Sequence, residues 1–220
     1  MERSGKTEMD WEFIIHHLIS GSIPMAVGFA LYCLILRMIG KKRSAGHTLA
    51  LFVFCFYFIS VLTVTGICIK PSFSPRIVTI PFADMIRGPV DTVLNILLFV
   101  PFGFFLPLLY KEYDSIGKIA FLGFLVSLSI EITQMFGFGV TDINDLITNT
   151  VGTCLGYLLY RSLSTALPDS WNSKIRANGK QCYSELLLFW AGSILIMLTI
   201  QVHIFRTLFA SGINSGEISM

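Results

Sequence analysis

Long apolar runs limit what this chain can fold into more than any other feature of its sequence. Several runs of roughly 20 residues are separated by short polar connections, and a helix of about 20 apolar residues crosses a hydrocarbon core of about 30 Å. Backbone N–H and C=O groups find no partners in lipid, so such runs must form helices. Hydrophobic residues make up 54% of the sequence and charged residues only 14%, which excludes an ordinary soluble domain.

We therefore predict an all-α, polytopic transmembrane helical bundle that forms a single integral membrane domain over residues 1–220. The prolines Pro75, Pro81 and Pro89 are incompatible with a regular spanning helix, so we expect residues 72–90 to form an interfacial or re-entrant segment. About six spans are predicted, over residues 22–39, 48–69, 91–110, 119–136, 142–160 and 185–205.

Charge and cysteine content exclude several other classes of protein. The net charge of +2 is too small to indicate nucleic-acid binding, and the basic residues cluster between apolar runs, where membrane topology explains them. The five cysteines have no close pair, so neither a disulfide framework nor a zinc site is indicated.

Residues 1–10 lack the apolar run and cleavage site of a removable signal peptide. We predict no cofactor and no resident metal ion.

The distribution of Lys and Arg predicts the orientation of the bundle. In a six-span arrangement, the segments on the side of the two termini hold 6 of these residues and the segments on the other side hold 10. Cytoplasmic loops carry the excess of Lys and Arg in membrane proteins. We therefore expect both termini to lie outside the cytoplasm.

Polar residues recur near one end of the predicted third and fourth spans. Arg87, Asp91 and Asn95 follow one another at intervals of four residues, which places them on one face of a helix. Glu131 lies thirteen residues beyond Lys118, roughly 20 Å along the fourth span. This distance places Glu131 in the outer third of the membrane, at the depth where the third span begins.

The fourth and fifth spans bring further polar groups to the same depth. Ser127, Glu131 and Gln134 share a face by their spacing of four and three, and Asn149 lies one turn after Asp145 on the fifth span. We expect these side chains to line an acidic, amide-rich recess that opens toward the outer leaflet. The candidate ligand-binding residues are Arg87, Asp91, Asn95, Glu131, Gln134, Asp142, Asp145 and Asn149.

Structural interpretations of the same residues remain open. Asp142 and Asp145 suit an N-cap and the first turn of a helix, and Gly152 and Gly156 have the small-residue spacing that lets two helices approach closely. The amides of the three candidate Asn and Gln residues suit hydrogen bonds between helices. Glu131 differs, because an ionisable group inside a span is costly. We expect a functional position there.

Three blocks of sequence carry a resemblance to a known family. They are NILLFVPFGFFLP at residues 95–107, SLSIEITQ at 127–134 and DINDLITNTVG at 142–152. In this order, and followed by Gly156-Tyr157, they resemble the VanZ-like membrane proteins over about half of the chain. The family often has Asp where this chain has Asn144, so three carboxylates in this turn are not expected here. The VanZ-like core would cover about 48–160, and the spans at 22–39 and 185–205 would be additional.

The resemblance implies a multi-pass protein of the bacterial cytoplasmic membrane, associated in the family's namesake with resistance to teicoplanin and related lipoglycopeptide antibiotics. It implies no established reaction. Membrane lipids are the expected partners, together with a lipoglycopeptide antibiotic or a lipid-linked cell-wall precursor, which meet the membrane at the outer leaflet.

Two classes of function fit these features. In the first, a non-enzymatic protein binds a lipid headgroup or a drug group, with Arg87 pairing with a phosphate or carboxylate and the amides of Asn95, Gln134 and Asn149 donating hydrogen bonds. In the second, the carboxylates of Glu131, Asp142 and Asp145 hold a divalent cation that activates water against a lipid phosphate or ester. No nucleophile motif supports an enzyme. A proton-coupled transporter is a third hypothesis, without the inverted repeats common in that class.

Overall fold

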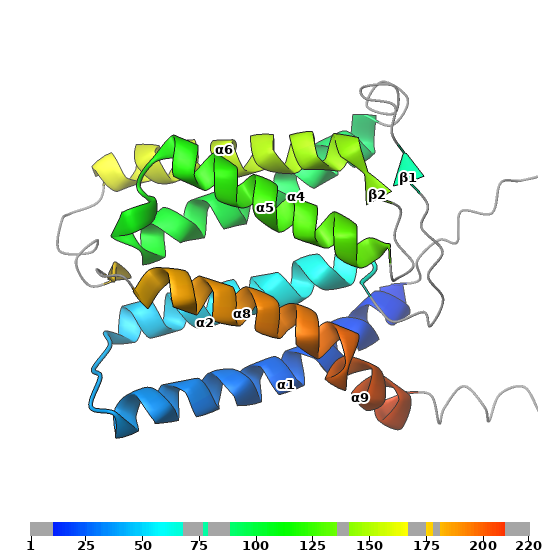
Figure 1. Cartoon of the computed structure of the whole chain (residues 1–220), viewed down its shortest axis with the longest axis horizontal. Helices are drawn as coiled ribbons and strands as arrows, with labels where there is room; N and C mark the ends of the chain where they lie inside the picture. The colour runs from blue at the N-terminus through cyan, green and yellow to red at the C-terminus, as the bar shows by residue number, and fades with distance from the viewer. Residues whose placement is uncertain are drawn as a thin grey trace, which may run out of the picture.

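The computed structural model describes residues 11–67, 77–78, 89–135, 141–166, 175–177 and 181–209. This part of the chain is a bundle of helices that run side by side, as Figure 1 shows. Two short strands and one 3-10 turn occur in the connections. The elements are α1 (Trp11–Met38), α2 (Ala45–Val64), β1 (Ile77–Val78), α4 (Pro89–Leu109), η1 (Lys111–Tyr113), α5 (Ile116–Gln134), β2 (Thr141–Asp142), α6 (Ile143–Ala166), α8 (Gln181–Leu198) and α9 (Ile200–Leu208).

The length and composition of the helices confirm the prediction of an all-α transmembrane bundle. Among the described residues, α1, α2, α4 and α5 are long and apolar enough to cross a membrane, and α8 with α9 makes a fifth span if the bent pair is one. The 24 residues of α6 are long enough, but polar residues in its first half lower its hydropathy. Because α6 packs lengthwise against α4 and α5, it lies at the depth of those spans.

The predicted spans differ in detail from the helices of the structure. The second helix ends at Val64, before the predicted end at residue 69, and the first and last spans differ more. The first helix begins at Trp11, well before residue 22, and continues through Pro24. The last predicted span is broken into α8 and α9, which are bent by 44° at Thr199. The backbone of Thr199, with φ −130° and ψ −77°, lies outside the helical region, which explains the break.

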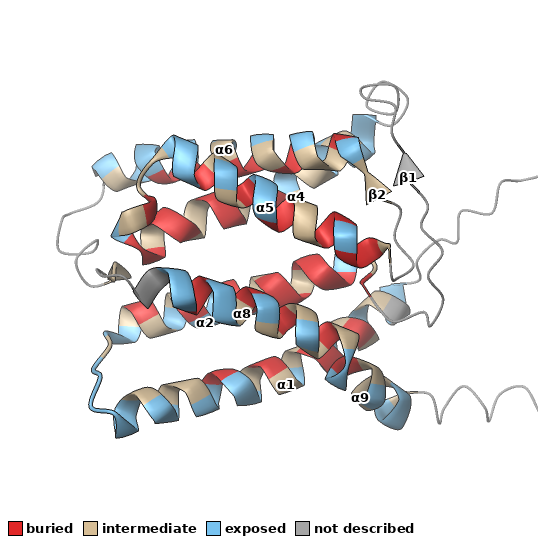
Figure 2. Ribbon diagram, in the orientation of Figure 1, coloured by how far each residue is buried: buried red, intermediate tan, exposed pale blue. Residues whose placement is uncertain are grey.

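Apolar side chains cover the outside of the bundle. Figure 2 shows exposed positions along the outer faces of the helices and buried positions where the helices meet. On α1, Leu31, Leu34 and Ile35 each expose more than half of their side chains. In water this would be an unusually large apolar surface, whereas lipid tails solvate it.

Aromatic side chains fill the centre of the bundle. Phe54 and Phe58 of α2 and Phe102 of α4 are buried together. Phe58 also packs edge to face with Trp190 of α8, at 5.0 Å between ring centroids. The indole Nε1 of Trp190 donates a hydrogen bond of 2.9 Å to Ser129 Oγ on α5. These contacts join α2 and α8 to the group formed by α4, α5 and α6.

The backbones of α4 and α6 are in direct contact through glycines. A Cβ added at Gly152 would lie 2.1 Å from the carbonyl oxygen of Ile96, and one at Gly156 would lie 2.0 Å from that of Val100. A Cβ at Gly103 of α4 would lie 1.9 Å from a backbone oxygen of α6. Only glycine permits this approach. The structure therefore confirms the packing role expected for Gly152 and Gly156.

A buried carboxylate joins three helices at the end of the bundle that holds the α1–α2 connection. Glu185 of α8 accepts hydrogen bonds from the hydroxyls of Tyr32 on α1 and, at 3.1 Å, Tyr110 after α4. It also pairs with the guanidinium of Arg43. The side chains of Arg43 and Glu185 are only 17% and 6% exposed, so the pair is largely removed from solvent.

The same cluster extends through His47 of α2. His47 Nδ1 lies 2.8 Å from the carbonyl oxygen of Ile175, which only accepts hydrogen bonds, so Nδ1 carries the proton. The unprotonated Nε2 then accepts a hydrogen bond of 2.6 Å from Arg43. The connection between α6 and α8 is thereby joined to the start of α2.

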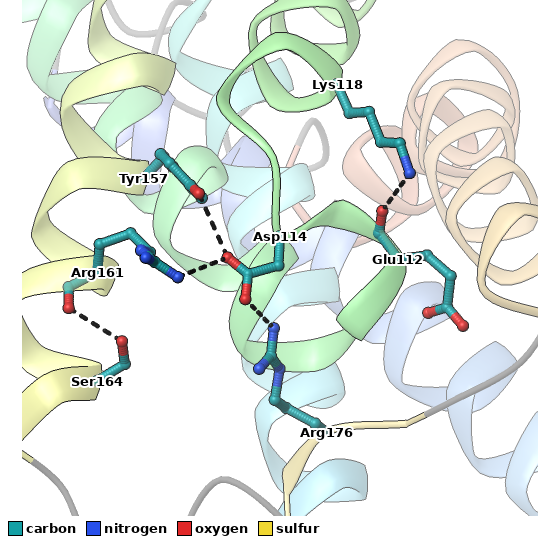
Figure 3. A network of polar contacts seen from close by, with 7 residues as sticks. All are labelled: Glu112, Asp114, Lys118, Tyr157, Arg161, Ser164 and Arg176. Atoms are coloured by element: carbon teal, nitrogen blue, oxygen red, sulfur yellow. Dashed lines mark hydrogen bonds and ion pairs between the residues drawn. The ribbon is translucent and has the colours of Figure 1, made fainter.

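A second charged cluster stabilises the connections at this end, as Figure 3 shows. Asp114, just after η1, accepts hydrogen bonds from Arg176 at 3.0 Å and from Tyr157 of α6 at 3.3 Å. Arg161 approaches the same carboxylate at 3.5 Å. Arg176 also lies 5.6 Å from the centre of the Tyr160 ring, a favourable position for a cation.

The opposite end of the bundle holds the start of α1, the end of α9 and a short parallel pairing of β1 with β2 (Figure 1). Ile77 pairs with Thr141 and Val78 with Asp142. Before α4 begins, Ile77 and Val78 are the only described residues of the predicted interfacial or re-entrant segment at 72–90. The pairing places this part of the segment beside Thr141 and Asp142. These two residues, with the end of α5 and the start of α6, are called the α5–α6 turn below.

The orientation of the bundle remains a prediction that a reporter can test. We expect alkaline phosphatase fused after Met220 to be active, because the excess of Lys and Arg lies on the other side. Enzymatic activity and protease access in intact cells are the measurements. If alkaline phosphatase is inactive at this position and a reporter that works only in the cytoplasm is active there, the predicted orientation is wrong.

Candidate functional site

Glu131 organises the turn between α5 and α6. It lies one turn before the end of α5 and is 3% exposed. Its Oε2 accepts a hydrogen bond of 2.8 Å from the backbone N–H of Asp142, and its carbonyl oxygen accepts one of 3.0 Å from Thr141 Oγ1. The carboxylate inside this apolar span therefore has one backbone N–H partner, which reduces the free energy of burying it.

Asp142 forms the N-cap of α6. Its Oδ1 accepts hydrogen bonds from the backbone N–H of Asn144 at 2.8 Å and from the Asn144 side chain at 2.9 Å. The bond to the second residue of the helix is the one expected of an N-cap aspartate. The structural interpretation of Asp142 is thus confirmed, and Asn144, which is buried, supports the same turn.

Side chains of α4, α5 and α6 meet beside this turn. Asn95 Nδ2 of α4 donates a hydrogen bond of 2.6 Å to Asp145 Oδ1 of α6. Asn149 Nδ2 donates one of 2.9 Å to Ser127 Oγ of α5, and this hydroxyl lies 3.5 Å from the carbonyl oxygen of Asp145. The three helices that were expected to contribute polar groups at one depth do so, through direct contacts.

The other candidate residues lie at the margin of this group. Gln134 Nε2 donates a hydrogen bond of 2.9 Å to the carbonyl oxygen of Thr65, at the end of α2. Asp91, in the first turn of α4, is exposed. Arg87, the expected charge partner of Glu131, lies outside the described residues.

Of the two roles expected for the amides, the structure shows the structural one, in which they donate hydrogen bonds to neighbouring helices. The side-chain nitrogens of Asn95, Gln134 and Asn149 were expected to donate to a ligand, but each of them donates to a protein oxygen. Two buried amide oxygens of this group, Asn149 Oδ1 and Gln134 Oε1, have no hydrogen-bond partner among the described residues. Buried polar atoms are nearly always satisfied, so these oxygens require a donor that the protein does not supply.

The carboxylates do not converge on one point. Glu131 and Asp142 are engaged with backbone N–H groups, and Asp145 with Asn95. Among the residues that the structure describes, no group of three or more His, Cys, Asp or Glu is placed to hold a metal ion. Glu131, Asp142 and Asp145 are therefore not assembled as one set of metal ligands.

Three residues of this group were not among the predicted site residues: Ser127, Asn144 and Thr148. Ser127 lies one turn before Glu131, and this spacing indicated its face. Asn144 follows Asp142 by two residues, a spacing typical of a side-chain turn at a helix start. Thr148 donates a hydrogen bond of 3.1 Å to the carbonyl oxygen of Asn144, and no pattern in the sequence indicated it.

Comparison with known proteins places these residues in a family. The sequence model of the VanZ/LLP1 family matches residues 44–164, which include α2, α4, α5 and α6. Protein VanZ of Enterococcus faecium is 48% identical over 71 residues, which are 32% of this chain and 44% of that protein. The chain thus aligns with less than half the length of this relative. No solved structure matches.

Proposed function

The chain belongs to the VanZ/LLP1 family, and we propose that it is a bacterial cytoplasmic-membrane protein that contributes to low-level resistance against teicoplanin-type lipoglycopeptides. The family match and the similarity to Protein VanZ support this proposal. Of the two function classes, binding is the better supported, because the carboxylates are engaged separately instead of forming one catalytic centre.

The observation that carries the binding proposal is the excess of hydrogen-bond acceptors around the α5–α6 turn. The oxygens of Asn149 and Gln134 lack donors, and Glu131 and Asp145 add two carboxylates beside them. Such a group of acceptors favours a ligand that brings N–H or O–H donors, most strongly an ammonium group. We therefore propose that the site binds the amino or hydroxyl groups of a drug or of a lipid headgroup, while the surrounding apolar helices contact acyl chains.

Removing the two carboxylate charges tests this proposal. Glu131→Gln and Asp145→Asn each keep an oxygen for the hydrogen bonds with Asp142 N–H and Asn95 but cannot attract an ammonium group. Loss of a charged hydrogen bond weakens binding by roughly 10- to 100-fold. We expect each variant to lose protection against teicoplanin in a susceptible host, measured as the inhibitory concentration, with unchanged abundance in the membrane.

Glu12→Gln is the matched control, because Glu12 is an exposed carboxylate of α1 outside this group. It should protect as well as the unaltered protein. Fluorescent teicoplanin and amine-bearing lipids, titrated separately into the protein in nanodiscs, distinguish a drug from a lipid as the ligand. Full protection by both Glu131→Gln and Asp145→Asn would remove the α5–α6 turn as the site.

A further inference from the structure

A cavity separates α1 from α2 at the end of the bundle opposite to the α5–α6 turn. Its volume is about 1040 Å³, and apolar side chains such as Phe29, Leu34, Leu49 and Phe52 form its walls. Figure 1 shows that the two helices diverge toward their connection. The rings of Phe29 and Phe52 meet edge to face at 5.3 Å between centroids, so they close the narrow end.

The dimensions of this cavity match one leaflet of a membrane. From Phe29 to Met38, the end of α1, the helix rises by roughly 14 Å at 1.5 Å per residue, which is about half of a hydrocarbon core of roughly 30 Å. The closed aromatic end therefore lies near the middle of the membrane, and the open end lies at its surface. A molecule that fills this space has an apolar part about as long as an acyl chain.

The open end carries basic side chains that have no acidic partner among the described residues. Arg37, Lys41 and Lys42 line the cavity and are exposed, and no ion pair in the described part of the chain includes them. Arg43 also lines the cavity, but it is held by Glu185 and contributes no free charge. Three cations at the membrane surface above an apolar space are complementary to an anionic headgroup with an acyl chain below it.

We propose that this cavity binds an anionic phospholipid, with the phosphate between Arg37, Lys41 and Lys42 and an acyl chain between α1 and α2. A drug or a peptide fits the observations less well, because the cavity lies beside lipid-exposed residues of both helices and spans one leaflet. The site is separate from the α5–α6 turn, and the whole of α1 lies outside the residues that match the family. The proposal therefore does not depend on the proposed function.

A lipid titration tests the proposal. The purified protein is mixed with phosphatidylglycerol or with phosphatidylcholine of identical chains, and bound lipid is counted by native mass spectrometry. We expect the unaltered protein to prefer phosphatidylglycerol. The triple variant Arg37→Gln/Lys41→Gln/Lys42→Gln should lose roughly 100-fold in affinity for that lipid, at about fivefold for each charge, while its binding of phosphatidylcholine stays the same.

Two further variants make the result specific. A control triple variant removes the same number of positive charges elsewhere and should keep the preference for phosphatidylglycerol. Its substitutions are Lys111→Gln, Lys118→Gln and Arg206→Gln. Ala30→Trp fills the apolar cavity, keeps every charge, and should abolish binding. If the first triple variant retains the preference, or if the control triple variant loses it to the same extent, the cavity is not the binding site and the proposal is wrong.

Discussion

Gly156→Ala is expected to destabilise the bundle by about 3 kcal/mol, the upper end of the usual range for overpacking. Alanine is the better helix former, so the loss comes from packing alone. The added methyl group would lie 2.0 Å from the carbonyl oxygen of Val100, and a backbone atom cannot rotate away. The apparent Tm in detergent should fall by about 6–12 °C, at about 2–4 °C for each kcal/mol in a chain of this size.

Gly28→Ala supplies the matched control for this prediction. Gly28 also lies in a helix, and a Cβ added there meets nothing within 4 Å. Its apparent Tm should stay the same or rise slightly, because only the helix propensity changes. Equal Tm values for Gly156→Ala and Gly28→Ala would show that α4 and α6 are farther apart than in this structure.

Glu185→Ala is expected to have the larger effect, about 3–5 kcal/mol. The substitution leaves the largely buried Arg43 guanidinium without its carboxylate partner and removes the acceptor of the Tyr32 and Tyr110 hydroxyls. An unpaired charge that is removed from water is more costly than the original pair. The apparent Tm should therefore fall by at least about 6 °C, whereas Tyr32→Phe should cost only about 1 kcal/mol.

Replacing both charged partners separates a charge effect from a general loss of packing. Arg43→Met/Glu185→Leu substitutes apolar side chains of similar size, and such exchanges are often neutral. We expect the double variant to be more stable than Glu185→Ala. A double variant as unstable as Glu185→Ala would mean that the unpaired charge of Arg43 is not the cause of the lost stability.

Helical periodicity and apolarity predicted the parts of this structure that depend on single segments. The positions of α2, α4, α5 and α6 follow from the length of their apolar runs. The 3.6-residue period fixes which side chains share a face, so Asn95, Asp145 and Asn149 could be expected to meet once three helices were placed at the same depth. The N-cap interpretation of Asp142 needed only the local sequence.

Features that depend on how distant segments meet were not predictable in this way. Glu185 and Arg43 are far apart in the sequence, and no spacing relates them. From the sequence alone, Glu185 is the first residue of a predicted span and Arg43 is a basic residue in a loop. The acceptors to which the side-chain amides of Asn95 and Asn149 donate are likewise determined by the neighbouring helices. The divergence of α1 from α2 is a property of the packed bundle alone.

The pairing of β1 with β2 has a consequence for how the α5–α6 turn can open. The backbone of Asp142 pairs with Val78, and its N–H donates to the carboxylate of Glu131. Movement of Thr141 and Asp142 away from α5 therefore has to break the contact with β1 or carry β1 along. Local opening at this turn is thus linked to displacement of β1, and β1 and β2 should exchange their amide hydrogens as one cooperative unit.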